Sequence, residues 1–315
     1  MFHGVIPPLC TPLTDDGEVD TASLERLCGF LLDAGVHGLF VCGSTGEVSQ
    51  LTDQARATAV RTVVGTAAGQ VPVLAGAIDT ATERVLAHAR AAQALGADAV
   101  VATAPFYVGV TAPEVRAHYR RLAAALDVPL VAYDIPANVG RKLPVEVLAE
   151  LAHDAAIGAV KDSSGDLESF QRLLDATRGT GVDCLTGSEN LADLALLRGA
   201  HGVVPGLGNV DPHGYLRLHR AARAGDWAAA RDEQRRLVRL FAITTVADPA
   251  RVGPISAALG AFKTALVLRG VIDRPHTLPP LLPLTGAETE RIAAHLATAG
   301  LLPDARAQAE AETPS

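Results

Sequence analysis

The feature that most constrains the fold of this chain is a repeated unit, a short apolar run followed by an alanine-rich stretch with helical periodicity. The segments LDAGVHG, QALGADA and LLRGAHG repeat one junction, in which a helix ends at a glycine turn and the next strand begins. Repeated βα units of this kind build a parallel sheet covered by helices. Eight such units close naturally into an α/β fold of the (β/α)8 type, the TIM barrel.

Both kinds of segment can be placed along the chain. Short runs rich in β-branched residues alternate with longer stretches whose apolar residues recur with helical spacing. The predicted strands are residues 4–11, 38–43, 71–77, 99–103, 129–134, 157–161, 183–187 and 202–205. The predicted helices that follow them are residues 21–34, 53–68, 80–95, 112–126, 144–152, 166–177, 189–198 and 211–222.

The chain is longer than a minimal barrel. Such a barrel typically needs ~250 residues, and this chain has 315, of which 49% are hydrophobic and 20% charged, as in ordinary globular proteins. We expect the barrel to occupy residues 1–225 and a C-terminal helical extension, packed on the barrel, to occupy residues 226–300. Residues 301–315 are small and polar, so we expect them to be disordered. The helices of the extension are predicted at residues 226–241, 256–268 and 287–299.

Charge and cysteine content exclude several classes of protein. The net charge is −8 and no run of Lys and Arg occurs, so the chain lacks the basic surface that binds nucleic acid. The N-terminus has no basic segment before a long apolar stretch, and no apolar run approaches the ~20 residues that cross a bilayer. The four cysteines are scattered without a CxxC pair, which favours reduced thiols. These patterns predict a cytoplasmic protein with no nucleic-acid or membrane partner.

Lys161 lies in IGAVKDSSGD, at the end of the sixth predicted strand. Because burial disfavours an ammonium group, such a lysine either pairs with an acid, such as Asp162, or serves as a nucleophile. A neutral amine at a barrel mouth can attack a ketone, and the resulting iminium turns a neighbouring carbon into an enamine. The DSSGD that follows is predicted to be the turn into the next helix, with Asp162 or Ser164 as its N-cap.

Tyr133 lies near the end of the preceding predicted strand, at the height of Lys161. Its hydroxyl could pass protons while a carbinolamine forms and loses water, or the ring could be an aromatic anchor whose hydroxyl caps the barrel. The residues alone leave both interpretations open.

The segment GSTGE follows the second predicted strand. It lacks the spacing and the lysine of a phosphate-binding P-loop, so nucleotide binding is disfavoured. The hydroxyls of Ser44 and Thr45, together with their backbone N–H groups, are suited to hold a carboxylate. Alternatively, the two glycines only make a tight turn.

The histidines do not indicate a metal site. None of the ten lies at a predicted C-terminal strand end, and no HExxH spacing occurs. His37 and His201 fall at the opposite, N-terminal strand ends, where packing explains them better. We therefore expect no catalytic metal.

The order of these motifs resembles the dihydrodipicolinate synthase and N-acetylneuraminate lyase family of pyruvate-dependent aldolases. The resemblance runs from PPLCTPLTDDGEVD through GSTGE, the PFY that ends at Tyr107, YDIPANVG and AVKDSSGD to about residue 210, and less clearly through the C-terminal helices. Each motif is weak alone, but Tyr133 and Lys161 on successive strands make the combination specific. The resemblance implies a (β/α)8 barrel with three C-terminal helices.

The resemblance also implies roles for particular residues. Lys161 would form a Schiff base with pyruvate or another 2-oxo acid, and Tyr133 would shuttle protons. Ser44 and Thr45 would hold the substrate carboxylate and link the tyrosines. The covalent Schiff base would leave no need for a cofactor.

Two further implications concern the assembly and the pocket wall. Tyr107 matches a tyrosine that many members lend to the site of a neighbouring subunit, and members are usually homotetramers built as a dimer of dimers. Val204 matches a position whose backbone carbonyl lines the pocket.

The chain departs from the family pattern at two positions. Asp134 stands where asparagine is common, and Asn138 stands where dihydrodipicolinate synthases have an arginine that grips the carboxylate of the aldehyde substrate. An asparagine cannot make that bidentate charged contact. Glu189 falls where sialic acid lyases bind sugar hydroxyls, although a first-turn glutamate is also favoured by the helix dipole.

These observations predict a class I aldolase or lyase that joins pyruvate and an aldehyde, or cleaves their adduct, with a hydroxylated 2-oxo acid as substrate. One alternative is synthesis of 4-hydroxy-tetrahydrodipicolinate from pyruvate and aspartate semialdehyde. A second is dehydration of a 2-oxo sugar acid. A remote alternative is a non-catalytic protein that binds 2-oxo acids.

Overall fold

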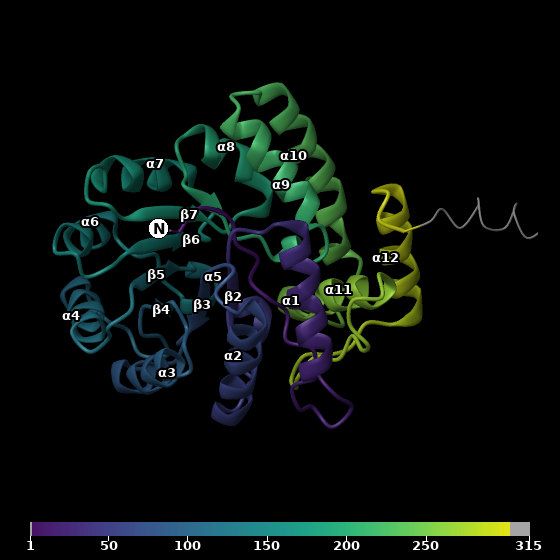
Figure 1. Cartoon of the computed structure of the whole chain (residues 1–315), viewed down its shortest axis with the longest axis horizontal. Helices are drawn as coiled ribbons and strands as arrows, with labels where there is room; N and C mark the ends of the chain where they lie inside the picture. Colours follow the sequence, from purple (N-terminus) through teal and green to yellow (C-terminus); the bar gives the residue numbers. More distant parts are fainter. Residues whose placement is uncertain (1, 303–315) are drawn as a thin grey trace, which may run out of the picture.

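The eight predicted strands form one parallel barrel in a computed structural model that describes residues 2–302. The strands are hydrogen-bonded in the order β1-β8-β7-β6-β5-β4-β3-β2, and a parallel bridge between Pro8 and Phe40 closes the circle. The prediction of a TIM barrel is confirmed (Figure 1). The strands are β1 Gly4–Val5, β2 Leu39–Val41, β3 Val73–Gly76, β4 Ala99–Thr103, β5 Leu130–Asp134, β6 Ala159–Asp162, β7 Asp183–Thr186 and β8 Gly202–Val203.

Helices surround the barrel in the predicted order. Those between strands are α1 Thr21–Ala34, α2 Asp53–Ala67, α3 Thr82–Ala94, α4 Ala112–Ala123, α5 Pro136–Val139, α6 Val145–His153, α7 Leu167–Ala176 and α8 Ala192–Leu197. The helices after the last strand are α9 Pro212–Arg223, α10 Trp227–Phe241, α11 Pro254–Leu268 and α12 Gly286–Thr298. Four 3-10 turns complete the described chain: η1 Ser44–Gly46, η2 Glu189–Leu191, η3 Gly206–Asn209 and η4 Ala242–Thr245.

Most helix boundaries follow local signals. Asp20 caps α1 by accepting a hydrogen bond from the backbone N–H of Ser23, and Gly35 ends that helix in the left-handed conformation with φ 89°. Thr111 and Glu114 form a capping box at the start of α4. The short helix α5 was not predicted, because a single turn after a proline shows no periodicity.

The N-cap predicted for α7 is wrong. Asp166 caps this helix, and its carboxylate accepts the backbone N–H of Ser169 at 2.9 Å. Asp162 is a strand residue instead, since β6 continues one residue beyond Lys161. Its Oδ1 accepts both the backbone N–H and the hydroxyl of Ser164, so this pair forms the turn and leaves the cap to Asp166.

The helices after the barrel gather on one side of it. Figure 1 shows α9 to α12, coloured green to yellow, on the side that also carries α1. Helix α10 packs along α9, and α11 packs against α12 and η4. The disordered tail predicted for residues 301–315 lies almost wholly outside the described residues, which end at 302.

The two histidines at the N-terminal strand ends serve packing, as predicted. His37 accepts the backbone N–H of Val5 at its Nδ1, and His201 accepts that of Cys184 in the same way. Among residues 2–302, no group of three or more His, Cys, Asp or Glu side chains is arranged to hold a metal ion.

The four cysteines carry free thiols and are all buried. Within the described part of the chain, every helix is too short or too polar to cross a membrane.

Candidate active site

Lys161 lies at the carboxyl end of β6 with only 5% of its surface exposed. Tyr133 is its direct partner across the β5–β6 pair. The Lys161 Nζ lies 4.1 Å from the centroid of the Tyr133 ring and 4.9 Å from that of the Phe40 ring. Within residues 2–302, no carboxylate lies at ion-pair distance from this amine. The lysine therefore contacts aromatic faces and has no counter-ion beside it.

Gly187 makes room for this lysine at the end of the neighbouring strand β7. A Cβ atom at this position would lie 3.0 Å from Lys161 Cε and 2.0 Å from Ser163 Oγ. Either contact requires a side chain to move, and the second is impossible without displacement. The glycine is thus part of the mouth because of close approach and not because of backbone conformation.

The acid that could have paired with Lys161 is held by another lysine. Lys142 Nζ donates to Asp134 Oδ2 at 2.5 Å, to Asp162 Oδ2 at 3.2 Å and to Ser164 Oγ at 3.0 Å. Asp134 also accepts the backbone N–H of Leu143. The alternation of side chains along a strand turns both aspartates away from Tyr133 and Lys161.

The cluster of Lys142, Asp134, Asp162 and Ser164 gives Asp134 a structural role. Burial raises the pKa of its carboxyl, although the hydrogen bond from Lys142 opposes the rise. For Lys142, burial lowers the pKa while the two carboxylates raise it, and the carboxylates prevail. The cluster ties the ends of β5 and β6 together directly behind Tyr133 and Lys161.

The GSTGE segment forms the turn η1 at the same mouth. Ser44 and Thr45 are half-buried. Among residues 2–302, their backbone N–H groups donate to no backbone carbonyl. Two hydroxyls and two N–H groups are therefore free to bind a carboxylate.

Glu47 ends this segment, but its side chain leaves the mouth. The residue adopts the left-handed conformation, with φ 59°, and its carboxylate forms an ion pair with Lys263 of α11. The other carboxylate oxygen accepts the backbone N–H of Leu278 at 2.7 Å. Lys263 is fully buried and also donates to the carbonyl of His276 at 2.5 Å. A charged pair thus anchors the candidate carboxylate-binding turn to the C-terminal helices.

Glu189 begins η2 after β7, near Lys161. Its Oε1 accepts the backbone N–H of Gly206 at 2.8 Å, and its backbone carbonyl accepts the side-chain amide of Gln234 in α10. Burial raises the pKa of Glu189, although the Gly206 N–H and the charge of Lys161 oppose the rise. One carboxylate oxygen is therefore already engaged by the protein.

Val204 follows β8 and is buried. Its N–H donates to the carbonyl of Thr186 at 2.7 Å. In the described part of the chain, its own carbonyl accepts no backbone hydrogen bond, which agrees with a carbonyl that faces the barrel mouth.

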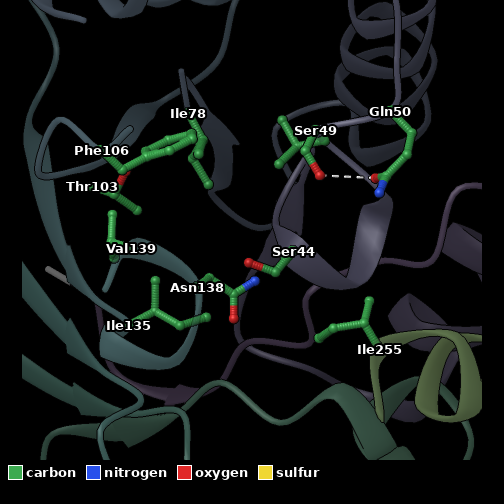
Figure 2. Close-up of a pocket in the computed structure, with 11 residues that line it drawn as sticks. Ser44, Ser49, Gln50, Ile78, Thr103, Phe106, Ile135, Asn138, Val139 and Ile255 are labelled. Atoms are coloured by element: carbon green, nitrogen blue, oxygen red, sulfur yellow. Dashed lines mark hydrogen bonds between the residues drawn. The ribbon is translucent and has the colours of Figure 1, made fainter. Parts of the chain in front are cut away.

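A cavity of about 110 Å³ opens on the β2–β5 side of the mouth (Figure 2). Lys161 and Tyr133 do not line it, but Thr103, which does, pairs with Tyr133 across β4–β5. The cavity therefore adjoins the tyrosine side of the lysine. The residues that line it are Ser44, Val48, Ser49, Gln50, Ile78, Thr103, Phe106, Ile135, Asn138, Val139 and Ile255.

Comparison with known proteins identifies the family. The model of the dihydrodipicolinate synthetase family matches residues 1–299. The chain belongs to this family. It is therefore an enzyme of the class I lyase and aldolase type, as the sequence predicted.

Relatives in the family carry two kinds of name. The chain is 36% identical over 301 residues to an uncharacterized DapA-like lyase of Halobacterium salinarum, covering 96% of this chain and 95% of the relative. It is 31% identical over 282 residues to a 4-hydroxy-tetrahydrodipicolinate synthase of Methanosphaerula palustris, covering 89% and 93%. Among solved structures, the family member YagE of E. coli K12, in complex with pyruvate, superposes with a TM-score of 0.89 at 28% identity and covers 96% of this chain and 100% of YagE.

Tyr107 is the predicted site residue that the structure does not bring to the mouth. It is 95% exposed, has φ 77° and does not line the cavity, whereas the preceding Phe106 does. Its assignment to the site of a neighbouring subunit stays a prediction.

Several residues of the mouth were missed from the sequence. Phe40, Gly187, Lys142 and Lys263 were not singled out. The number of lysines could have pointed to Lys142 and Lys263. The whole chain holds only three, so a partner could have been sought for each. No local pattern marks Phe40 or Gly187, whose roles depend on neighbouring strands.

Proposed function

We propose that this family member is a pyruvate-dependent aldolase or lyase in which Lys161 forms a Schiff base with pyruvate or another 2-oxo acid. The observation that carries the proposal is the environment of the Lys161 side chain. It is buried against the rings of Tyr133 and Phe40, and no carboxylate among residues 2–302 lies at ion-pair distance from its amine. Because no such ion pair holds the amine, the side chain is free to meet a substrate carbonyl at the barrel mouth, as a Schiff-base nucleophile must. The covalent Schiff base supplies the electron sink, and the reaction needs no metal and no cofactor.

The first half of the reaction forms the iminium. The Lys161 amine attacks the carbonyl carbon of pyruvate, and the carbonyl oxygen leaves as water after two protonations. We assign these proton transfers to the hydroxyl of Tyr133, whose ring lies against the amine. The hydroxyls and N–H groups of Ser44 and Thr45 hold the pyruvate carboxylate, and the carbonyl of Val204 faces the bound substrate.

The second half uses the enamine. Loss of a proton from the pyruvate methyl group gives a nucleophilic carbon, which attacks the carbonyl carbon of an aldehyde and forms a C–C bond. The aldehyde oxygen takes a proton and becomes a hydroxyl. Water then hydrolyses the iminium, which frees Lys161 and releases a 4-hydroxy-2-oxo acid; the reverse sequence is cleavage.

Synthesis of 4-hydroxy-tetrahydrodipicolinate is the rival that the names of several relatives suggest. That reaction needs a contact for the carboxylate of aspartate semialdehyde. Asn138 lines the cavity at the position predicted for the arginine that makes this contact, and no charged residue lines the cavity. The composition of the cavity disfavours this rival. Dehydration of a 2-oxo sugar acid would use the same iminium. Analysis of the products distinguishes it from aldol cleavage, because dehydration releases no aldehyde.

We propose further that the enzyme is a cytoplasmic homotetramer, a dimer of dimers. Two separate apolar surfaces support this. One is Tyr107 with Val108, both strongly exposed next to the candidate site. The other is Leu194 with Leu197, which are exposed one turn apart on α8. Two different self-contacts are what a dimer of dimers requires.

Exchange of the pyruvate methyl protons in D2O tests the proposal without knowledge of the aldehyde. An enamine must form and be reprotonated by solvent, so deuterium should enter the methyl group, as followed by proton NMR. Tyr133→Phe should slow the exchange by about 10²- to 10⁴-fold, while the buried ring keeps the fold. Wild-type enzyme that binds pyruvate but exchanges no protons would refute the proposal and favour a non-catalytic 2-oxo acid binding protein.

A further inference from the structure

The composition of the cavity beside Tyr133 bears on the aldehyde. Of its 11 lining residues, six are apolar and five are polar without charge. No Lys, Arg, Asp or Glu is among them. The apolar residues are Val48, Ile78, Phe106, Ile135, Val139 and Ile255, and Figure 2 shows several of these side chains around the cavity.

A carboxylate on the aldehyde would find no counter-ion in this cavity. Arg141, three residues after Asn138 in the chain, does not line it and donates to the backbone carbonyl of Val110 instead. Removing a carboxylate from water without a charged partner or several hydrogen bonds costs several kcal/mol, on the order of the penalty for any unpaired buried ion. An uncharged aldehyde avoids this cost.

Polar groups suited to many hydroxyls are also scarce. Ser49 donates to Gln50 at 2.9 Å, which leaves mainly Ser44, Asn138 and Thr103, whose buried Oγ1 has no hydrogen-bond partner among residues 2–302. Figure 2 shows the side chains of Ser44 and Asn138 pointing toward one another across the cavity. Because Ser44 is assigned to the pyruvate carboxylate, the Asn138 amide and the Thr103 hydroxyl remain, and these match a single oxygen, such as that of the aldehyde, better than a polyhydroxylated chain.

Ile255 gives an independent sign that the cavity takes an apolar group. It lies in the first turn of α11, follows Pro254 and lines the cavity, yet 45% of its surface is exposed. Covering such a side chain stabilises a complex by about 25 cal/mol for each Å² removed from water. The cavity volume, about 110 Å³, is smaller than the ~150 Å³ of an engineered apolar cavity that holds benzene, so a short chain fits better than an aromatic ring.

We propose that this cavity is the aldehyde subsite and that it selects short, uncharged aliphatic aldehydes. The inference rests on the proposed function and names its second substrate. The pyruvate enamine carbon bonds to the aldehyde carbon, and the aldehyde oxygen, which accepts a hydrogen bond from the Asn138 amide, takes up from Tyr133 the proton that the pyruvate methyl group lost. Hydrolysis then releases a 4-hydroxy-2-oxo acid that carries an alkyl group. A hydroxylated aldehyde, which the sequence predicted from Glu189 and Asn138, is the competing outcome.

An aldehyde panel tests the inference on the full-length enzyme. With saturating pyruvate, kcat/KM for propanal, butanal and 2-methylpropanal should exceed that for glyceraldehyde and for aspartate semialdehyde by at least about tenfold, a typical discrimination for one or two apolar groups. A higher kcat/KM for either polar aldehyde overturns it.

Two variants locate the selection in the cavity. Ile255→Ser should lower kcat/KM for butanal by about tenfold, and Asn138→Arg should raise kcat/KM for aspartate semialdehyde relative to butanal. Val238→Ser, at a similarly exposed apolar residue of α10, is the matched control and should change neither. Equal effects of Ile255→Ser and Val238→Ser would contradict the claim that the cavity selects the aldehyde.

Proton exchange on pyruvate distinguishes failure of the subsite inference from failure of the proposed function. Exchange together with preference for a polar aldehyde overturns the subsite alone. Absence of exchange overturns the proposed function, and the subsite inference falls with it.

Discussion

Lys161 and Lys263 are both buried, but their surroundings differ in one respect. Lys263, with none of its surface exposed, pairs with Glu47 and donates to the carbonyl of His276. Lys161, with 5% exposed, faces the rings of Tyr133 and Phe40, and no carboxylate among residues 2–302 lies at ion-pair distance from it. A buried lysine with a carboxylate partner is held in place by that partner. A buried lysine without one is available for chemistry, and it lies where the barrel opens.

The third lysine of the chain completes this comparison. Lys142 is partly exposed and bridges Asp134 and Asp162. Since the chain has only three lysines, two are accounted for as structural and one is not. Substitution of each by methionine, which preserves the length of the side chain and removes the charge, should therefore give different results.

Lys161→Met should have the largest effect, and only on activity. Loss of the nucleophile should lower turnover by on the order of 10⁴-fold or more. The free energy of unfolding should stay the same or rise, because an apolar chain replaces an unpaired buried amine. Steady-state kinetics and urea denaturation measure the two quantities. A large loss of stability would show that the lysine has a structural partner.

Lys263→Met should have the opposite profile. Breaking a buried ion pair from one side leaves Glu47 charged and unpaired, which typically costs about 3–5 kcal/mol of stability. Urea denaturation at a fixed protein concentration measures it, since oligomers gain stability with concentration. The double variant Glu47→Gln with Lys263→Met should recover part of the loss, because the amide oxygen can still accept the Leu278 N–H. A single variant as stable as the wild type would contradict the pairing.

Lys142→Met should fall between these two. The lysine is partly solvent-exposed, so we expect a loss of about 1–3 kcal/mol from the buried acceptors left behind. Adding Asp134→Asn should restore part of the stability by removing one of the two facing charges. Recovery that is no greater than with a surface control such as Asp232→Asn would argue against the cluster.

Acid pH should distinguish buried neutral groups from buried charged ones. His118, which bridges Thr82 and the carbonyl of Thr103, and His219 have pKa values lowered by burial to about 4 from the usual 6.5. Between these values the unfolded chain binds protons that the folded one does not, so stability is lost as pH falls from about 6.5 to 4. The slope is at most about 1.4 kcal/mol per pH unit for each histidine. His118→Gln should reduce it in pH-dependent urea denaturation; an unchanged slope would contradict the assignment.

The barrel could be predicted from the sequence because its signals are local. Each glycine junction and each apolar run falls within a few residues, and the motif order then placed Tyr133 and Lys161 on neighbouring strands. The same logic failed at the start of α7, where Asp162 or Ser164 was expected as the cap and Asp166 is found. Lys142, twenty positions earlier in the chain, holds Asp162 in the β5–β6 cluster.

The rest of the mouth depends on contacts between distant parts of the chain. Glu47 and Lys263 are 216 positions apart, and no pattern in either segment predicts their pairing. The apolar wall of the cavity was also missed, because Ile255 comes from α11 while most other lining residues come from loops of the barrel. Sequence motifs thus predicted the candidate nucleophile Lys161 but not the apolar cavity beside it.

Borohydride reduction in the presence of pyruvate tests the central claim most directly. The reagent reduces an iminium to a stable secondary amine, so one 1-carboxyethyl group should be found on Lys161 by peptide mass spectrometry. Lys142 and Lys263 provide internal controls and should stay unmodified, and Lys161→Met should remain unlabelled. Labelling at either of the other two lysines, or none in enzyme that turns over pyruvate, would contradict the account.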